Sequence, residues 1–349
     1  MNKDFLFDLL KTHSPSGHEH NCIKVFDDYC SKFGKHIYTD KMGNSAFSIG
    51  NENGPIVMIS GHIDEISMLV QYIDDDGFIH FVKNGGIDPK ILLGMNVVIL
   101  TKKGEINGVI GKAPIHVEWR DEEKKTKVTP IKDMKVDCGF KSKREAEEYV
   151  SVGDVIIYNT PITELHNGRI SSKGLDDKVG AFIAAEVARH IAQEEPLKNI
   201  NLVFAACCEE ETGCRGASLV AKNLNPQYSI DYDVTFATDD GHVEKNEWGD
   251  IKLGKGAAIA FGDDKVPSFV NTIVDIAKAA EIPFQPFCVG SGGTNTDSIQ
   301  MGASDCTTSL ISIPERNMHT SVEVVDLFDI SAIIALTVAV IRHLDETLG

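Results

Sequence analysis

The sequence predicts an α/β protein whose central mixed, largely parallel sheet is flanked by helices, with a small β-rich domain inserted into the larger one. Two observations carry this prediction. Short runs of β-branched and aliphatic residues, typical of buried strands, alternate with stretches of helical period. Between about residues 67 and 162, short apolar segments are instead separated by glycine and charged turns, a pattern that favours a separate β-rich unit.

The predicted elements follow this division into residues 1–66, an inserted domain over 67–162, and residues 163–349. The first part contains helices over 2–11 and 18–33 and strands over 46–49 and 56–60. In the insertion, strands are expected over 78–82, 97–100, 109–110 and 155–158, with a short helix that Ser142 and Glu145 cap. The last part contains helices over 179–193, 273–280 and 324–344, and strands over 200–206, from 232 onward and over 308–313.

Charge and cysteine content limit the classes of partner. The chain has 52 acidic and 34 basic residues, a formal net charge of −18, which opposes nucleic-acid phosphates and anionic membranes. The longest charge-free apolar tract, residues 330–341, is shorter than a bilayer requires, and the N-terminus lacks a secretory signal pattern. Eight cysteines occur without a C-x-x-C pair, as is typical of reduced thiols. We therefore expect a cytoplasmic protein with no nucleic-acid or membrane partner.

Acidic residues and histidines cluster after several predicted strands. The strand over 200–206 runs into the glutamates 209–211, and the strand over 56–60 runs into His62 and Asp64. Asp233 lies in a later strand region, His319 follows the last strand, and Asp176 begins a helix. Each feature alone has an ordinary explanation, such as an acidic turn, a surface loop or a helix cap. Together they predict a site, because ligands bind beyond the carboxyl ends of the strands in an α/β sheet.

The residue types in this set favour metal chemistry. Two histidines with several carboxylates suit a pair of borderline divalent ions better than a structural zinc site built on cysteine. Cys207 and Cys208 precede the glutamates, but adjacent residues on a strand point to opposite faces, so we expect them in the core. One carboxylate can bridge two ions while another acts as general base on a water molecule that the cations acidify. The sequence therefore predicts metal-assisted hydrolysis.

Motifs in a fixed order carry a family resemblance along nearly the whole chain. They are PSGHE near the start, D-x-x-G-N at Asp40 to Asn44, GHIDE, GLDDKVG, EETGCRGA, DVTFATD, GTNTDSIQ and PERNMHTSVE. In this order and spelling the sequence resembles the dinuclear metallo-aminopeptidases of the glutamyl and deblocking aminopeptidase family, which form tetrahedral dodecamers. EE-x-G-x-R-G-A is specific, whereas D-x-x-G-N alone is a weak signal.

The resemblance implies a role for each candidate ligand. Asp176 would bridge two metal ions, with His62 and Asp233 completing one site and Glu211 and His319 completing the other. Asp233 is assigned through the match of Asp-Val-Thr, and Asp239 is the alternative ligand. The ions would be zinc or cobalt, with manganese as a further option.

The resemblance also implies the catalytic residues. Glu210 would be the general base, and Asp64 would orient the first metal site. The choice of Glu210 over Glu209 depends on the alignment of the motif at Gly213 and Arg215, and no family role falls on Glu209.

Substrate contacts and two departures complete the comparison with the family pattern. Gly293, Thr294 and Asn295, in a glycine loop, would contact the substrate. Asn295 stands where relatives commonly carry aspartate, which bears on substrate preference. Lys178 stands where arginine is usual, which keeps the charge but loses a planar fork of donors.

We therefore expect an enzyme that removes N-terminal residues from peptides. The inserted domain would mediate assembly into a homo-oligomer, a dodecamer built from dimers. One alternative is a metal-independent β-glucanase-type glycosidase, since two carboxylates suffice to cleave a glycoside bond. The other is a catalytically inactive scaffold of the same fold.

Overall fold

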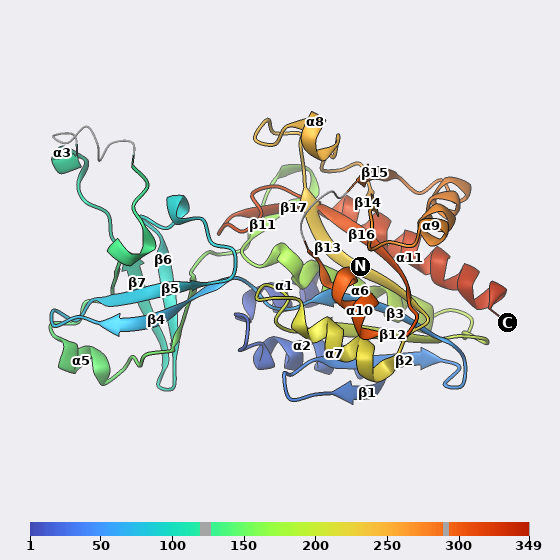
Figure 1. Cartoon of the computed structure of the whole chain (residues 1–349), viewed down its shortest axis with the longest axis horizontal. Helices are drawn as coiled ribbons and strands as arrows, with labels where there is room; N and C mark the ends of the chain where they lie inside the picture. The colour runs from blue at the N-terminus through green and yellow to red at the C-terminus, as the bar shows by residue number, and fades with distance from the viewer. Residues whose placement is uncertain (119–126, 289–292, 349) are drawn as a thin grey trace. The chain divides into compact units, whose positions relative to one another are not determined.

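The computed structural model describes residues 1–118, 127–288 and 293–348. These residues form two compact units (Figure 1). The larger unit comprises Met1–Glu65, Ile162–Met318 and Val322–Gly349, and the smaller unit comprises Ile66–Pro161 and His319–Ser321. The chain therefore leaves the larger unit after Glu65 and returns to it at Ile162.

The larger unit contains most of the helices and two sheets. Its helices are α1 (Lys3–Lys11), α2 (His20–Cys30), α6 (Leu175–Ala192), α7 (Arg215–Leu224), α8 (Lys245–Trp248), α9 (Pro267–Ala279), α10 (Asn295–Gly302) and α11 (Leu327–Thr347). Its main sheet contains β1 (Lys35–Thr39), β2 (Ser45–Gly50), β3 (Ile56–His62), β12 (Asn201–Cys207), β13 (Tyr228–Phe236), β14 (Ala257–Phe261), β15 (Phe284–Cys288) and β16 (Thr307–Glu315). A second sheet contains β10 (Thr163–Glu164), β11 (Arg169–Ser172) and β17 (Glu323–Asp326).

The smaller unit is a closed barrel with the strand order β4-β5-β8-β7-β6-β9. These strands are β4 (Ser67–Ile73), β5 (Ile79–Asn84), β6 (Asn96–Thr101), β7 (Gly104–Ile110), β8 (Val136–Asp137) and β9 (Val155–Tyr158), and the short helices are α3 (Ile115–Glu118) and α5 (Lys143–Glu147). Ser142 caps α5 by accepting the N–H of Glu145 at 3.3 Å, as the sequence predicts. Closure of the barrel pairs its edge strands and so protects their backbone groups from other chains.

The main sheet is mixed and largely parallel, as predicted. Its order is β1-β2-β12-β3-β13-β16-β14-β15. The four central strands β12, β3, β13 and β16 run parallel, whereas β1, β2 and β14 each make antiparallel pairs. The central strands therefore present their carboxyl ends at one edge of the sheet.

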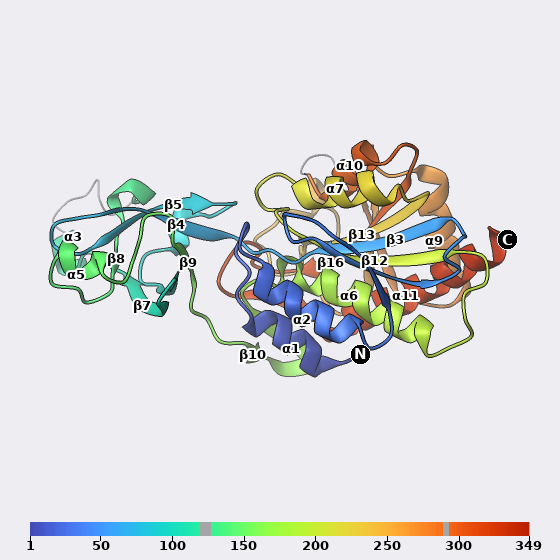
Figure 2. The same cartoon turned by 90° about the horizontal axis from the view of Figure 1, so that it is seen from below.

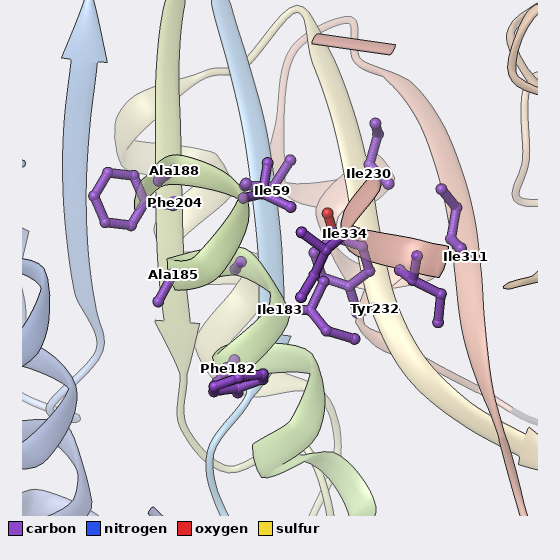
Figure 3. Close-up of a cluster of buried hydrophobic side chains, with 14 of the residues drawn as sticks. Ile59, Phe182, Ile183, Ala185, Ala188, Phe204, Ile230, Tyr232, Ile311 and Ile334 are labelled. Carbon is purple, nitrogen blue, oxygen red and sulfur yellow. The ribbon is translucent and has the colours of Figure 1, made fainter. Parts of the chain in front are cut away.

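Helices cover both faces of this sheet (Figure 2). Helices α6, α11, α1 and α2 lie on one face, and α7 and α10 lie on the other. The core on the α6 face is shown in Figure 3, where Phe182, Ile183, Ala185 and Ala188 of α6 lie near Ile59, Phe204, Ile230, Tyr232, Ile311 and Ile334. The opposite core joins Met58, Val203 and Ala205 of the sheet to Ala217, Val220 and Ala221 of α7 and Ile299 of α10.

Two glycines let α6 approach β3 at backbone distance. A Cβ atom on Gly61 of β3 would lie 2.3 Å from the carbonyl carbon of Gly180 in α6. A Cβ on Gly180 would lie 2.0 Å from Oδ2 of Asp177. Real Cβ atoms do not come this close to other heavy atoms. A side chain at Gly61 would therefore require a shift of the α6 backbone, and one at Gly180 would require the Asp177 carboxylate to move.

The structure differs from the sequence prediction at several elements. Strands β1 and β4 were not predicted. No residue of β1 is buried, and exposed residues interrupt the buried residues of β4, so neither strand gives a continuous apolar run. The last helix begins at Leu327 and not at residue 324, because Glu323–Asp326 pairs with β11 as β17. Asp326 then ends the strand and caps the helix, since its Oδ1 accepts the N–H of Phe328 at 3.0 Å.

Helix α11 is longer than the apolar tract seen in the sequence. Its 21 residues are long and apolar enough to cross a membrane by length and composition. Here Ile330, Ile333, Leu336 and Val340 are buried in the core of the larger unit. The hydropathy of this helix is thus explained by its packing in the fold.

Substitution of Phe204 tests the packing of the core on the α6 face of the sheet. Its side chain is fully buried, with ring centroids 5.7 Å from Phe47 and 5.8 Å from Phe33. We predict that Phe204→Ala lowers the free energy of unfolding by about 3–5 kcal/mol, because it removes a buried aromatic ring and leaves a cavity. Chemical denaturation measures this loss. Met301→Ala, at a side chain that is 85% exposed, should change stability by less than about 0.5 kcal/mol. Equal effects of the two substitutions would contradict the packing described.

Candidate functional site

Neighbouring parallel strands bring the candidate residues to one edge of the main sheet. Strand β12 pairs with β3 in a register that places Cys207 opposite His62. The glutamates 209–211 follow β12, and Asp64 follows β3, so both sets leave the sheet at the same end. Strand β13, on the other side of β3, carries Asp233.

His62 lies at the centre of a buried group of possible metal ligands. Its Nε2 is 3.0 Å from Oδ1 of Asp176, and its Nδ1 is 3.1 Å from the carbonyl oxygen of Asp64. His62, Asp176 and Asp233 each offer a ligand atom within 4.8 Å of the others, and all three are buried. The structure thus brings together residues that are far apart in the sequence.

Asp64 connects this group to the turn after β12. Its Oδ1 accepts the backbone N–H of Glu210 at 3.0 Å, and its Oδ2 accepts the N–H of Glu211 at 3.2 Å. The Ser16 hydroxyl donates to the same Oδ2 at 2.6 Å. With its carbonyl beside the His62 ring, Asp64 therefore fixes the imidazole and the glutamate turn together.

The three glutamates take different directions. The Glu209 carboxylate pairs with Arg215 at 3.0 Å, and the Arg215 side chain is 60% exposed. Glu210 instead places Oε2 at 3.9 Å from Nε2 of His62, while its Oε1 accepts a hydrogen bond from the Cys214 thiol at 3.1 Å. The Glu210 carbonyl also accepts the N–H groups of Gly213 and Cys214, each at 2.8 Å. This geometry separates Glu210 from its neighbour Glu209.

Several carboxyl groups are buried close together in the site, and this shifts the pKa values of its residues. Burial raises the pKa of Asp233 and of Glu211 well above the usual range of a carboxyl, and nearby carboxylates raise both further. Burial also raises the pKa of Glu210, and the charge of His62 and the hydrogen bond from the Cys214 thiol oppose that rise. For His62, burial alone would lower the pKa, but hydrogen bonds to Asp176 and Asp64 raise it well above its ordinary value.

A divalent cation fits this donor set. Its charge would offset the mutual repulsion of buried carboxylates. Imidazole nitrogen and carboxylate oxygen are donors that zinc, cobalt and manganese accept.

Three more buried acids surround the group and were not singled out in the sequence. Oε2 of Glu323 accepts the N–H of Leu175 at 2.8 Å and of Asp176 at 3.4 Å, so Glu323 holds the segment that carries Asp176. Asp177 Oδ1 accepts the N–H of Gly180 at 3.0 Å. Both carboxylate oxygens of Glu315 are buried without a hydrogen-bond partner among the described residues. Glu315 and Glu323 lie within the quoted PERNMHTSVE motif, which was the available signal.

The alternative ligand Asp239 has another partner. Its Oδ1 accepts from Nε of Arg316 at 2.7 Å, and its Oδ2 accepts the N–H of Leu253 at 3.2 Å. The group formed with His62 and Asp176 contains Asp233. Cys207 and Cys208 are fully buried in two different hydrophobic clusters, which confirms the prediction that they point to opposite faces.

The remaining candidates lie in connecting segments. His319 has a positive φ of 60° and belongs to the three residues that group with the smaller unit, where its Nδ1 is 2.9 Å from the Gly86 carbonyl oxygen. At the start of α10, Gly293 is exposed, and Thr294 caps the helix by accepting the N–H of Thr296 at 3.2 Å. Asn295 is fully buried.

Known proteins resemble the chain over almost its full length. The family model for M42 glutamyl aminopeptidase matches residues 43–336. The lysyl aminopeptidase of Pyrococcus furiosus is 30% identical over 341 residues, covering 96% of this chain and 95% of that protein.

Solved structures show the same fold. A TET aminopeptidase from a marine-sediment thaumarchaeon superposes with a TM-score of 0.92 at 29% identity, covering 99% of this chain and 98% of the other. The TET1 peptidase of Pyrococcus horikoshii, which can assemble into a tetrahedron or a large octahedral shell, has a TM-score of 0.86 at 28% identity, with 97% and 98% of the two chains covered.

Because buried carboxyl groups crowd the site, we expect divalent cations to stabilise the folded protein. Saturating zinc or cobalt should raise the thermal midpoint, because an ion that binds only the folded state at 100 times its Kd stabilises it by about 2.7 kcal/mol. EDTA should reverse the shift in differential scanning fluorimetry. Asp233→Asn should reduce the shift, whereas Asp250→Asn, which alters an acid paired with surface lysines, should leave it unchanged. The same shift in all three proteins would place the binding site elsewhere.

Proposed function

The chain belongs to the M42 glutamyl aminopeptidase family and is a metal-dependent aminopeptidase, and we propose that its metal centre is built on His62, Asp176 and Asp233. The observation that carries the proposal is the buried convergence of these three residues beside Glu210. By the family resemblance, a second set of ligands would comprise Asp176, Glu211 and His319, and would share Asp176 with the first. A carboxylate has two oxygens, so we assign Asp176 as the bridge between two ions.

The donors in the two sets determine which ions fit. Each set combines one imidazole with two carboxylates, which favours zinc or cobalt, with manganese as a further candidate. When bound, such ions polarise a carbonyl group and lower the pKa of water.

The protein's own groups would orient the reactants and move the proton. Glu210 would accept a proton from the attacking water and deliver it to the amine that leaves as the peptide bond breaks. Its backbone N–H is held by Asp64, and its carboxylate faces His62 across 3.9 Å. Asp64 would thereby keep the base and the imidazole in fixed relative positions. Contacts of Gly293, Thr294 and Asn295 with the substrate stay a prediction.

Two variants test the assignment of the base. Glu210→Gln should reduce kcat by at least about 100-fold, because the amide cannot accept the proton. Its metal content, measured by elemental analysis, should stay near that of the wild type. Glu209→Gln is the matched control, since Glu209 pairs with exposed Arg215, and should retain activity within a few fold. Loss of metal from Glu210→Gln would instead mean that the base and a ligand have been exchanged.

A substrate screen separates this function from the alternatives. Aminoacyl chromogenic amides should be hydrolysed with zinc, cobalt or manganese present, and EDTA should stop the reaction. Cellulose cleavage that survives EDTA would favour a glycosidase. Full metal occupancy with no activity on any peptide library would favour an inactive scaffold.

We also propose that the chain assembles into a homo-oligomer, a dodecamer built from dimers, with residues 67–162 forming contacts between subunits. The assembly of the Pyrococcus horikoshii relative supports this proposal. Light scattering after gel filtration should give the mass of twelve 38.1-kDa chains. A monomer at micromolar concentration would contradict the proposal.

We propose a cytoplasmic location for the protein. The eight cysteines are free, which agrees with this location.

A further inference from the structure

A buried carboxylate next to Asp64 is bound by two lysines. Glu65 is 3% exposed, Lys173 is 4% exposed and Lys178 is fully buried. Nζ of Lys173 donates to Glu65 Oε2 at 2.5 Å, and Nζ of Lys178 donates to Oε1 at 2.9 Å. The backbone N–H of Ser14 also donates to Oε1 at 2.9 Å. Each oxygen of this carboxylate therefore has a cationic donor.

These contacts join the chain segments that carry the metal ligands. Glu65 follows Asp64 directly, so its position constrains the end of β3. Lys173 precedes Gly174, whose φ of 61° turns the chain towards Asp176. Lys178 follows Asp176 by two residues and also donates to the Thr12 carbonyl at 2.9 Å. Glu65 thus holds the chain on both sides of the proposed bridging ligand.

One lysine would suffice to neutralise Glu65. The two ammonium groups hold the pKa of Glu65 well below its usual range, although burial opposes this effect. Burying a second cation is unfavourable, and burial lowers the pKa of Lys173. Neutralisation of Glu65 alone therefore accounts for one of the two lysines. The second lysine also binds the second carboxylate oxygen and so fixes the orientation of the carboxylate.

The chemistry of lysine explains why two are needed. The planar guanidinium of an arginine at 178 could bind both oxygens of a carboxylate, whereas an ammonium group binds as a point charge. Here Lys178 takes one oxygen and Lys173 takes the other. Lys173 comes from the connection between β11 and α6, so this arrangement ties that connection to β3.

We propose that Lys173 is a positioning residue of the metal centre, acting through Glu65 to hold Asp64 and Asp176 at the separation that the ions require. This inference rests on the proposed function, because it takes Asp176 as a metal ligand. Lys173 itself does not touch the ions or the substrate. Its effect is to reduce the rearrangement that metal binding would otherwise demand.

Metal affinity of Lys173→Met tests the proposal. Methionine fills a similar volume without a donor, and Glu65 keeps Lys178 as its counter-ion. We expect zinc and cobalt to bind about 10-fold more weakly, the lower end of the range for substitutions beyond the direct ligands. Competition with a chelator, at a temperature where the variant is folded, measures this affinity without reference to activity. At saturating metal, KM should change less than the metal Kd.

Arg189→Met provides a matched control. Arg189 pairs at 2.7 Å with Glu186, a fully buried carboxylate near the other end of α6. Its loss should lower the thermal midpoint of the metal-free protein while metal affinity stays within about twofold of the wild type. Lys173→Arg, which keeps a cationic donor, should recover most of the affinity lost in Lys173→Met.

The outcomes are distinct. Unchanged affinity in Lys173→Met overturns the inference, and so does tighter binding, which is what removal of a positive charge alone would produce. If Lys173→Met does not fold, Lys173→Ala, which also removes the donor, is measured by the same criteria. A wild-type protein that binds no divalent metal would refute the proposed function itself.

Discussion

The close approach of α6 to β3 is the constraint on which the site depends. Gly61 and Gly180 pack so closely that a Cβ on Gly61 would lie 2.3 Å from the backbone of α6. His62 follows Gly61, and Asp176 lies four residues before Gly180. Backbone contact here thus brings the imidazole and the carboxylate to 3.0 Å. A side chain at Gly61 would push α6 away from β3 and so separate the two proposed ligands.

This packing places several carboxyl groups at one buried edge of the main sheet. The repulsion between their charges must then be offset. Burial and mutual repulsion raise the pKa of Asp233, Glu211 and Asp177. Backbone N–H groups donate to Glu323, although burial still raises its pKa, and Lys173 and Lys178 pair with Glu65. A divalent cation would offset the charge of the carboxylates that we propose as its ligands. Charge balance therefore connects the stability of the fold to its proposed chemistry.

The presence of buried strands was more predictable than the position of individual side chains. Apolar runs identified β3, β12 and β16, because strands buried on both faces read as continuous hydrophobic segments. β1, whose burial is only partial, gave no such run and was missed. Family motifs assigned different roles to Glu210 and Glu209, which stays a prediction. In the structure Glu209 pairs with Arg215. Glu65 lies in the quoted GHIDE motif, but no local pattern indicated its lysine partners, which are up to 113 residues away in the chain.

By itself the sequence determined the α/β class and predicted an inserted β-rich segment and the residue types of the site, since periodicity and short motifs are local properties of the chain. Tertiary structure decided which acids meet. Asp233 joins His62 and Asp176 while Asp239 pairs with Arg316, and Glu65 acquires two lysines. Such choices depend on strand register and on the close contact of α6 with β3. Both are set by packing between segments distant in sequence, which no local pattern records.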